Sequence, residues 1–183
     1  MRLLSVVLAF FSLFSREPNH NDPVEIAGEI LQQTEVFAHK RYPLHACGTI
    51  MMMPSGNVKE IGLCFQAKTF LTRDHLRILL LECGEKLIQQ INSNQPFQKF
   101  LNKRPFTMKE ARIIIYNIDK SGDEPLDPLI TNAEISGGVL TYLTQDPKKK
   151  WTYKNEFQES YEEALEIIKQ NQMKNMPLNS VKK

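Results

Sequence analysis

An isoleucine-rich run near the middle of the chain limits the folds that this sequence can adopt. Residues 111–118 read ARIIIYNI and contain three consecutive isoleucines. β-branched residues favour strands, and a continuous apolar run is typical of a strand that is buried on both faces. We therefore expect a sheet covered by helices, and other apolar patterns in the chain should supply those helices.

Two amphipathic helices are predicted from their capping residues and their spacing. The first follows Asp22 as N-cap, has Pro23 at its first position and ends before Pro43. The second follows Thr72 as N-cap and runs to about Ile91, with a broad apolar stripe. Each helix thus has one apolar face that must pack against a sheet.

The strands are expected before and after the second helix. The runs 46–53 and 58–67, separated by Pro-Ser-Gly-Asn, predict a hairpin. The runs 111–118 and 135–144 predict two more strands, and a last helix is expected from Asn155. The predicted fold class is α+β, with a four-stranded, mostly antiparallel sheet packed with three helices in the order αββαββα.

The N-terminus has the pattern of an export signal. Arg2 precedes an apolar run from Leu3 to Phe14. A helix of about twelve residues reaches roughly 18 Å, against about 30 Å for a bilayer core, so no stable transmembrane span is expected in the mature chain. Residues 1–15 are therefore predicted to be a signal peptide and the protein to be exported, either periplasmic or secreted. Leu13 suits a cleavage site poorly, so an uncleaved membrane anchor and a cytoplasmic chain remain alternatives.

The rest of the chain is predicted to form one domain between two short flanking segments. A chain of 183 residues usually makes one domain, and its core is large enough to fold without a cofactor. We expect a linker over 16–21, a single α+β domain over 22–170 and a disordered tail over 171–183. The tail loses the helical periodicity and contains Pro177.

The charge of the chain does not point to a polyanionic partner. Its formal net charge is +2, and the basic excess is local, at Lys148–Lys150 and Lys154 around Trp151. These lysines follow Asp146 and Pro147, which is typical of a solvated turn. Nucleic acid is therefore not expected as a partner. The expected partner is a protein or a small ligand of unknown identity.

Cys47 and Cys64 are the most testable pair in the sequence. If Ser55 and Gly56 are the central turn residues of the hairpin, Ile50 faces Ile61 and Cys47 faces Cys64. At a non-hydrogen-bonded pair the Cα atoms are about 4.5 Å apart, which is within disulfide range. Disulfides persist in oxidising compartments, so the export signal and a Cys47–Cys64 bridge support each other. A one-residue slip of the register would leave two free thiols.

His45 and Cys47 suggest an alternative, enzymatic function. They are two residues apart on one strand, so the imidazole could lower the pKa of the thiol and create a nucleophile. A thiol-dependent hydrolase would use such a dyad, but no group that would orient His45 is recognisable.

Cys83 lies on the apolar stripe of the second helix and is expected to be buried and inert.

An acidic loop is a weak candidate for a calcium site. Asp119, Asp123 and Asp127 place oxygen donors along residues 119–133, but Glu124 stands where the calcium-loop pattern requires glycine. The alternative is a mobile acidic surface loop, although long loops are often functional. No other metal site and no cofactor are predicted.

The sequence therefore favours an exported binding or interaction module over an enzyme. No set of acid, base or metal-binding residues converges, and the Cys47/His45 hydrolase remains the alternative. The methionines at 51–53 could form an adaptable binding surface or pack against the first helix.

Overall fold

The computed structural model describes residues 22–149 and 152–174. The predicted signal peptide (1–15) and linker (16–21) lie outside these residues, as do 150–151 and 175–183. The elements, in chain order, are α1 Pro23–Arg41, β1 Leu44–Met52, the 3-10 turn η1 Pro54–Gly56, β2 Glu60–Ala67, α2 Arg73–Ser93, α3 Gln95–Gln98, β3 Ala111–Asn117, β4 Ile130–Ser136, β5 Val139–Gln145, β6 Tyr153–Ser160 and α4 Tyr161–Lys174.

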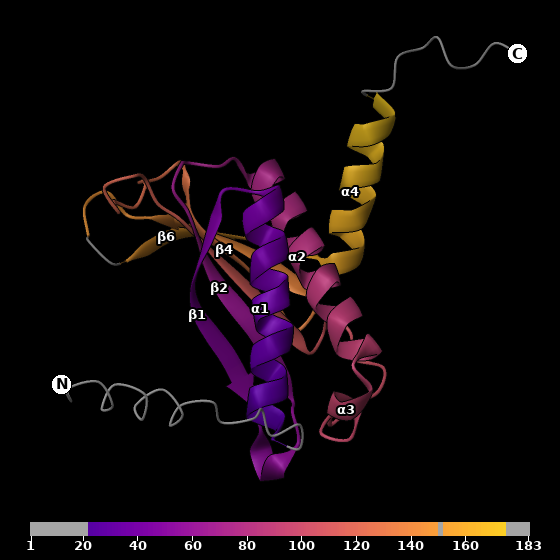
Figure 1. The fold of residues 1–183 in the computed structure, drawn as a ribbon. Helices are drawn as coiled ribbons and strands as arrows, with labels where there is room; N and C mark the ends of the chain where they lie inside the picture. The colour runs from indigo at the N-terminus through magenta and orange to yellow at the C-terminus, as the bar shows by residue number, and fades with distance from the viewer. Residues whose placement is uncertain (1–21, 150–151, 175–183) are drawn as a thin grey trace, which may run out of the picture.

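One sheet and a layer of helices make up the described part of the chain. The strands lie side by side in chain order from β1 to β6, and the helices lie together on one face of the sheet (Figure 1). In β3, Ile113 and Ile115 are buried under the helices, whereas Ile114 and Tyr116, on the other face, are half-buried. The expectation of a strand buried on both faces is therefore only half right.

None of the helices in the described ranges combines the length and the apolar character needed to cross a membrane.

The sheet has six strands in the described residues, so the prediction of four was wrong, whereas the α+β class is confirmed. All neighbouring strands are antiparallel except β2 and β3, which are parallel. Parallel neighbours need a crossover connection, and α2 provides it. The sheet is therefore mixed, with the hairpin β1–β2 on one side of the crossover and the meander β3–β6 on the other.

The capping residues that predicted the first two helices act as expected. The Asp22 carboxylate accepts a hydrogen bond from the backbone N–H of Val24 at 2.9 Å. The Thr72 hydroxyl accepts one from the backbone N–H of His75 at 3.4 Å. Each cap pairs an N–H group that a helix start leaves without an internal partner, so both predicted N-termini are confirmed.

Gly137 and Gly138 divide what was predicted as one strand over 135–144. Both have positive φ, 61° and 79°, and they join β4 to β5. Type I′ hairpin turns require positive φ at both central residues, a conformation that glycine adopts at little cost. The pair is therefore a turn signal rather than a weakened strand centre.

The prediction of a helix from Asn155 was wrong for residues 155–160, which belong to a strand. Residues 153–160 form the edge strand β6, and α4 begins only at Tyr161. Ser160 and Glu163 form a capping box: the Glu163 carboxylate accepts from Ser160 N–H at 2.7 Å, and the Ser160 hydroxyl accepts from Glu163 N–H at 3.1 Å. The helix runs to Lys174, so the tail predicted over 171–183 is helical in its first four residues.

A buried ion pair ties β6 to α2. Arg77 has a side chain only 5% exposed and donates from Nε and Nη2 to the Glu159 carboxylate at 2.7 and 3.1 Å. Tyr142 on β5 donates its hydroxyl to the same carboxylate at 2.5 Å, and Arg77 also pairs with Asp74. Burial, reinforced by this carboxylate, raises the pKa of Tyr142. The cluster fixes the otherwise polar strand β6 against the helix layer.

Candidate functional site

The two edges of the sheet differ in charge. β6 carries Lys154, Glu156 and Glu159, which is how many proteins protect an edge strand from pairing with other chains. β1 is the other edge; its nine residues, LHACGTIMM, contain no Asp, Glu, Lys or Arg. Among the described residues no strand pairs with the outer side of β1, so its backbone N–H and C=O groups form an edge open to another strand.

A groove of about 230 Å³ lies between α1 and the strands β1 and β2. Thr49, Met51 and Leu63 project toward the helix and line it from the sheet side. The helix side consists of residues at successive turns of α1, namely Val24, Ala27, Gly28, Leu31, Gln32 and Glu35. Most of this lining is apolar, and Val24 is 57% exposed at its rim.

Gly28 gives the helix wall of this groove its shape. A Cβ atom placed on Gly28 meets no other atom within 4 Å, so the space beside the helix is open. Glycine inside a helix costs about 1 kcal/mol relative to alanine, and no positive φ requires it at this position. A single glycine inside an otherwise regular helical pattern was the one sequence signal for the groove, and sequence reasoning missed it.

The register of the β1–β2 hairpin differs from the predicted one. Ala46 pairs with Phe65 as expected, but Gly48, not Cys47, is the partner of Cys64. A β-bulge at Cys47 causes this difference, and it shifts every pair from Gly48 to the turn by one residue. The shift also turns Met51 toward α1, which is the packing alternative considered for the methionines.

The three cysteines have free thiols in this structure. Cys47 is exposed, Cys64 is partly buried and Cys83 is fully buried, as expected for Cys83. Burial raises the pKa of Cys47, and the neighbouring Cys64 raises it further. A raised pKa keeps the thiol protonated near neutral pH, which is the opposite of what a catalytic nucleophile needs.

The predicted dyad is not assembled. The ring of His45 packs against that of His39, with 5.3 Å between centroids, and His45 is not among the groups that shift the pKa of Cys47. Because the bulge follows His45, the alternation that would place both side chains on one face is interrupted at Cys47.

The acidic loop holds Asp119 and Asp123 in one hydrogen-bond network, through the Ser121 hydroxyl, and Asp127 in another. Asp119 accepts from the hydroxyl and the N–H of Ser121 and from Asp123 N–H, and the first of these bonds contributes most to lowering the pKa of Asp119. Asp127 pairs with Lys154 at 2.7 Å and has a lowered pKa for that reason. The described residues contain no group of three or more His, Cys, Asp or Glu side chains placed to bind a metal ion. The three aspartates of the predicted calcium site are therefore not brought together as ligands.

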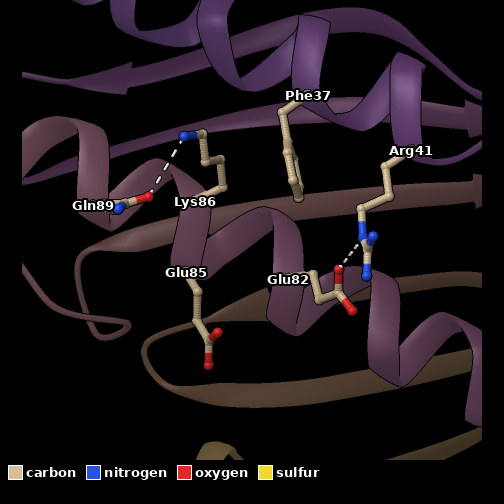
Figure 2. A pocket seen from close by; sticks show the side chains of 6 residues that line it. All are labelled: Phe37, Arg41, Glu82, Glu85, Lys86 and Gln89. Atoms are coloured by element: carbon tan, nitrogen blue, oxygen red, sulfur yellow. Dashed lines mark hydrogen bonds and ion pairs between the residues drawn. The ribbon is translucent and has the colours of Figure 1, made fainter.

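A second groove, of about 490 Å³, lies between α1 and α2 (Figure 2). Its charged side chains are already engaged: Arg41 donates to Glu82 at 2.7 Å, and Lys86 lies 5.9 Å from the centroid of the Phe37 ring. Burial alone would raise the pKa of Glu82, but the hydrogen bonds from Arg41 and Tyr42 outweigh it and lower the pKa. Glu85, the remaining charged residue of this lining, accepts from the Tyr161 hydroxyl at 3.0 Å, so this groove offers a ligand less than the α1–β1 groove does.

Comparison with known proteins identifies no relative of this chain. No protein-family model, no curated protein and no solved structure matches this chain. The class that the fold and the site define is a two-layer α+β protein with one uncharged sheet edge beside an apolar groove.

Proposed function

We propose that this chain is a protein-binding module that takes an extended segment of another protein as an additional strand against β1. The observation that carries the proposal is the uncharged edge of β1 beside the apolar groove under α1. In this binding mode the main-chain hydrogen bonds supply affinity, and pockets for alternate side chains supply specificity.

The groove specifies what kind of segment would fit. Alternate side chains of a strand added beside β1 point to the helix face of the sheet, where Val24, Gly28 and Leu31 line the groove. Apolar side chains lose water-exposed surface there, at roughly 25 cal/mol per Å² of apolar area. Since β1 has no charged residue, an uncharged segment with apolar residues at every second position is the complementary partner.

Filling the groove from Gly28 is expected to weaken binding without harming the fold. We would select peptides from a displayed random library on the full chain and measure the affinity of a synthetic selected peptide by calorimetry. Selected peptides should alternate apolar residues and lack proline, and Gly28→Trp should weaken binding at least about tenfold, or 1.4 kcal/mol. The reason is that the indole would occupy the open space beside the helix.

Two matched variants control this experiment. Gly28→Ala adds only a methyl group, and Gln89→Trp places the same indole in the α1–α2 groove, so both should keep most of the affinity. Equal binding to Gly28→Trp and wild type would contradict the proposal. A concentration-dependent dimer of the unliganded chain that pairs through β1, seen by sedimentation, would contradict it too, because a second copy would then take the edge.

The proposal includes export, which rests on residues 1–15, outside the described residues. Expression of the 183-residue chain in a cell with its export machinery should yield an exported fraction of lower intact mass, because a signal peptidase would remove this segment. A full-length chain confined to the cytosolic fraction would contradict export and leave the binding site unaffected.

A further inference from the structure

The bulge in β1 gives Cys64 two possible partners. Two residues of β1, Cys47 and Gly48, stand opposite the single residue Cys64, which is what defines a bulge. The regular pairs that enclose the bulge are Ala46–Phe65 and Thr49–Leu63. Exchanging the roles of Cys47 and Gly48 would therefore move the extra residue by one position and leave both enclosing pairs unchanged.

The position that Gly48 now occupies has the geometry of a disulfide partner. A Cβ atom placed on Gly48 lies 3.7 Å from the Cβ of Cys64 and 3.9 Å from its Sγ. Disulfide-bonded cysteines have Cβ atoms about 3.8 Å apart on average. If Cys47 took this position, its side chain would meet the thiol of Cys64 directly, and Gly48 would become the extra residue, a role that glycine fills readily because it lacks a Cβ.

We propose that Cys47 and Cys64 form a reversible disulfide by moving the bulge from Cys47 to Gly48. Exposed Cys47 and partly buried Cys64 are held on adjacent strands, where Cys47 immediately precedes the present partner of Cys64. The bridge would fasten β1 to β2 covalently. It goes beyond the proposed function, since it requires no peptide.

The oxidant is a low-molecular-weight disulfide such as glutathione disulfide. The Cys47 thiolate attacks one sulfur of the oxidant, which forms a mixed disulfide and releases one thiolate. The Cys64 thiolate then attacks the Cys47 sulfur and releases the second. The two protein thiols lose two protons and two electrons, and the oxidant becomes two thiols. Because burial raises the pKa of both protein thiols, the rate should rise about tenfold per pH unit below those pKa values.

The test is to incubate the full chain with excess glutathione disulfide at mildly alkaline pH, alkylate the remaining thiols and map them by peptide mass. We expect a disulfide between Cys47 and Cys64. The thiol of Cys83 should stay free and become alkylated once the chain is unfolded. Reduced glutathione should reverse the disulfide fully. Cross-strand nuclear Overhauser effects should move from the Gly48–Cys64 pair to the Cys47–Cys64 pair on oxidation. A mixed disulfide that never resolves, or only an intermolecular bridge through Cys47, would overturn the proposal.

A variant at Gly48 tests whether the bridge requires the bulge to move or forms from the present positions of Cys47 and Cys64. In Gly48→Val the added Cβ makes only ordinary contacts in its present site, but a β-branched residue lacks the conformational freedom that glycine has as the extra residue. The equilibrium constant for bridge formation should therefore fall about tenfold, whereas Thr49→Val, next to the bulge, should leave it unchanged. A bridge that forms equally well in Gly48→Val would overturn the migration. Because mass reports the bridge without any peptide, this result is independent of the proposed function.

Discussion

Replacing Gly62 with alanine is expected to destabilise the protein by about 3 kcal/mol, the upper end of the usual cost of overpacking. A Cβ atom on Gly62 would lie 1.8 Å from the carbonyl oxygen and 2.6 Å from the carbonyl carbon of Arg112, its partner across the parallel β2–β3 pair. Neither atom belongs to a flexible side chain, so the two strands would have to separate. Urea denaturation followed by circular dichroism measures the loss.

Gly28→Ala is the matched control for this substitution. It makes the same chemical change in open space on a helix, so it should stabilise the protein by up to about 1 kcal/mol through helix propensity. The two variants are thus expected to shift the urea midpoint in opposite directions. A Gly62→Ala protein as stable as wild type would mean that β2 and β3 do not approach each other as closely as described.

Replacing Arg77 with methionine is expected to cost about 3 kcal/mol of folding free energy. The substitution removes the positive partner of Glu159, whose side chain is only 12% exposed, and leaves a nearly buried carboxylate without its counter-ion. The Tyr142 hydroxyl remains as a neutral donor, which does not replace the lost charge. The loss should appear as a lower urea midpoint and as faster hydrogen exchange in β6.

A double-mutant cycle identifies the source of that loss. Arg77→Met combined with Glu159→Leu should recover most of the stability, because it removes both buried charges together. Arg41→Met is the surface control: Arg41 pairs with Glu82 but is 57% exposed, so its loss should lower the urea midpoint far less than Arg77→Met does. Additive effects of the two substitutions at Arg77 and Glu159 would contradict a direct coupling.

The parts of the fold that could be predicted from sequence are those controlled by neighbouring residues. Asp22 and Thr72 cap helices by bonding to N–H groups two or three residues away, so their signal is local. β6 was missed for the opposite reason. It is a polar edge strand, and what holds it is a bond between Glu159 and Arg77, 82 residues apart in the chain. Ser160 and Glu163 did carry a readable capping box that marks the end of this strand.

The orientation of the residues that line the candidate site depends on the bulge at Cys47, which the alternation of apolar residues did not reveal. The actual turn of the hairpin is longer than the two-residue turn that was assumed. The bulge at Cys47 adds one residue to β1 and compensates for this difference, so the outer pairs, such as Ala46 with Phe65, are the predicted ones. An insertion of one residue reverses every side chain beyond it, so Met51 and Thr49 face the groove only because of the bulge. Alternation alone cannot locate such an insertion.

The order of the strands across the sheet has a consequence for how the protein is made. Within residues 22–149 and 152–174, each strand pairs with the one before it in the chain, from β1 to β6, so none of these strands has to insert between two that have already formed. A chain synthesised from its N-terminus can therefore extend the sheet in one direction, strand by strand, with mainly short loops to close. The last strand to emerge, β6, completes the growing edge and brings charged residues to it. The first strand, β1, is uncharged and stays at the starting edge throughout synthesis, which exposes it to other chains for the longest time.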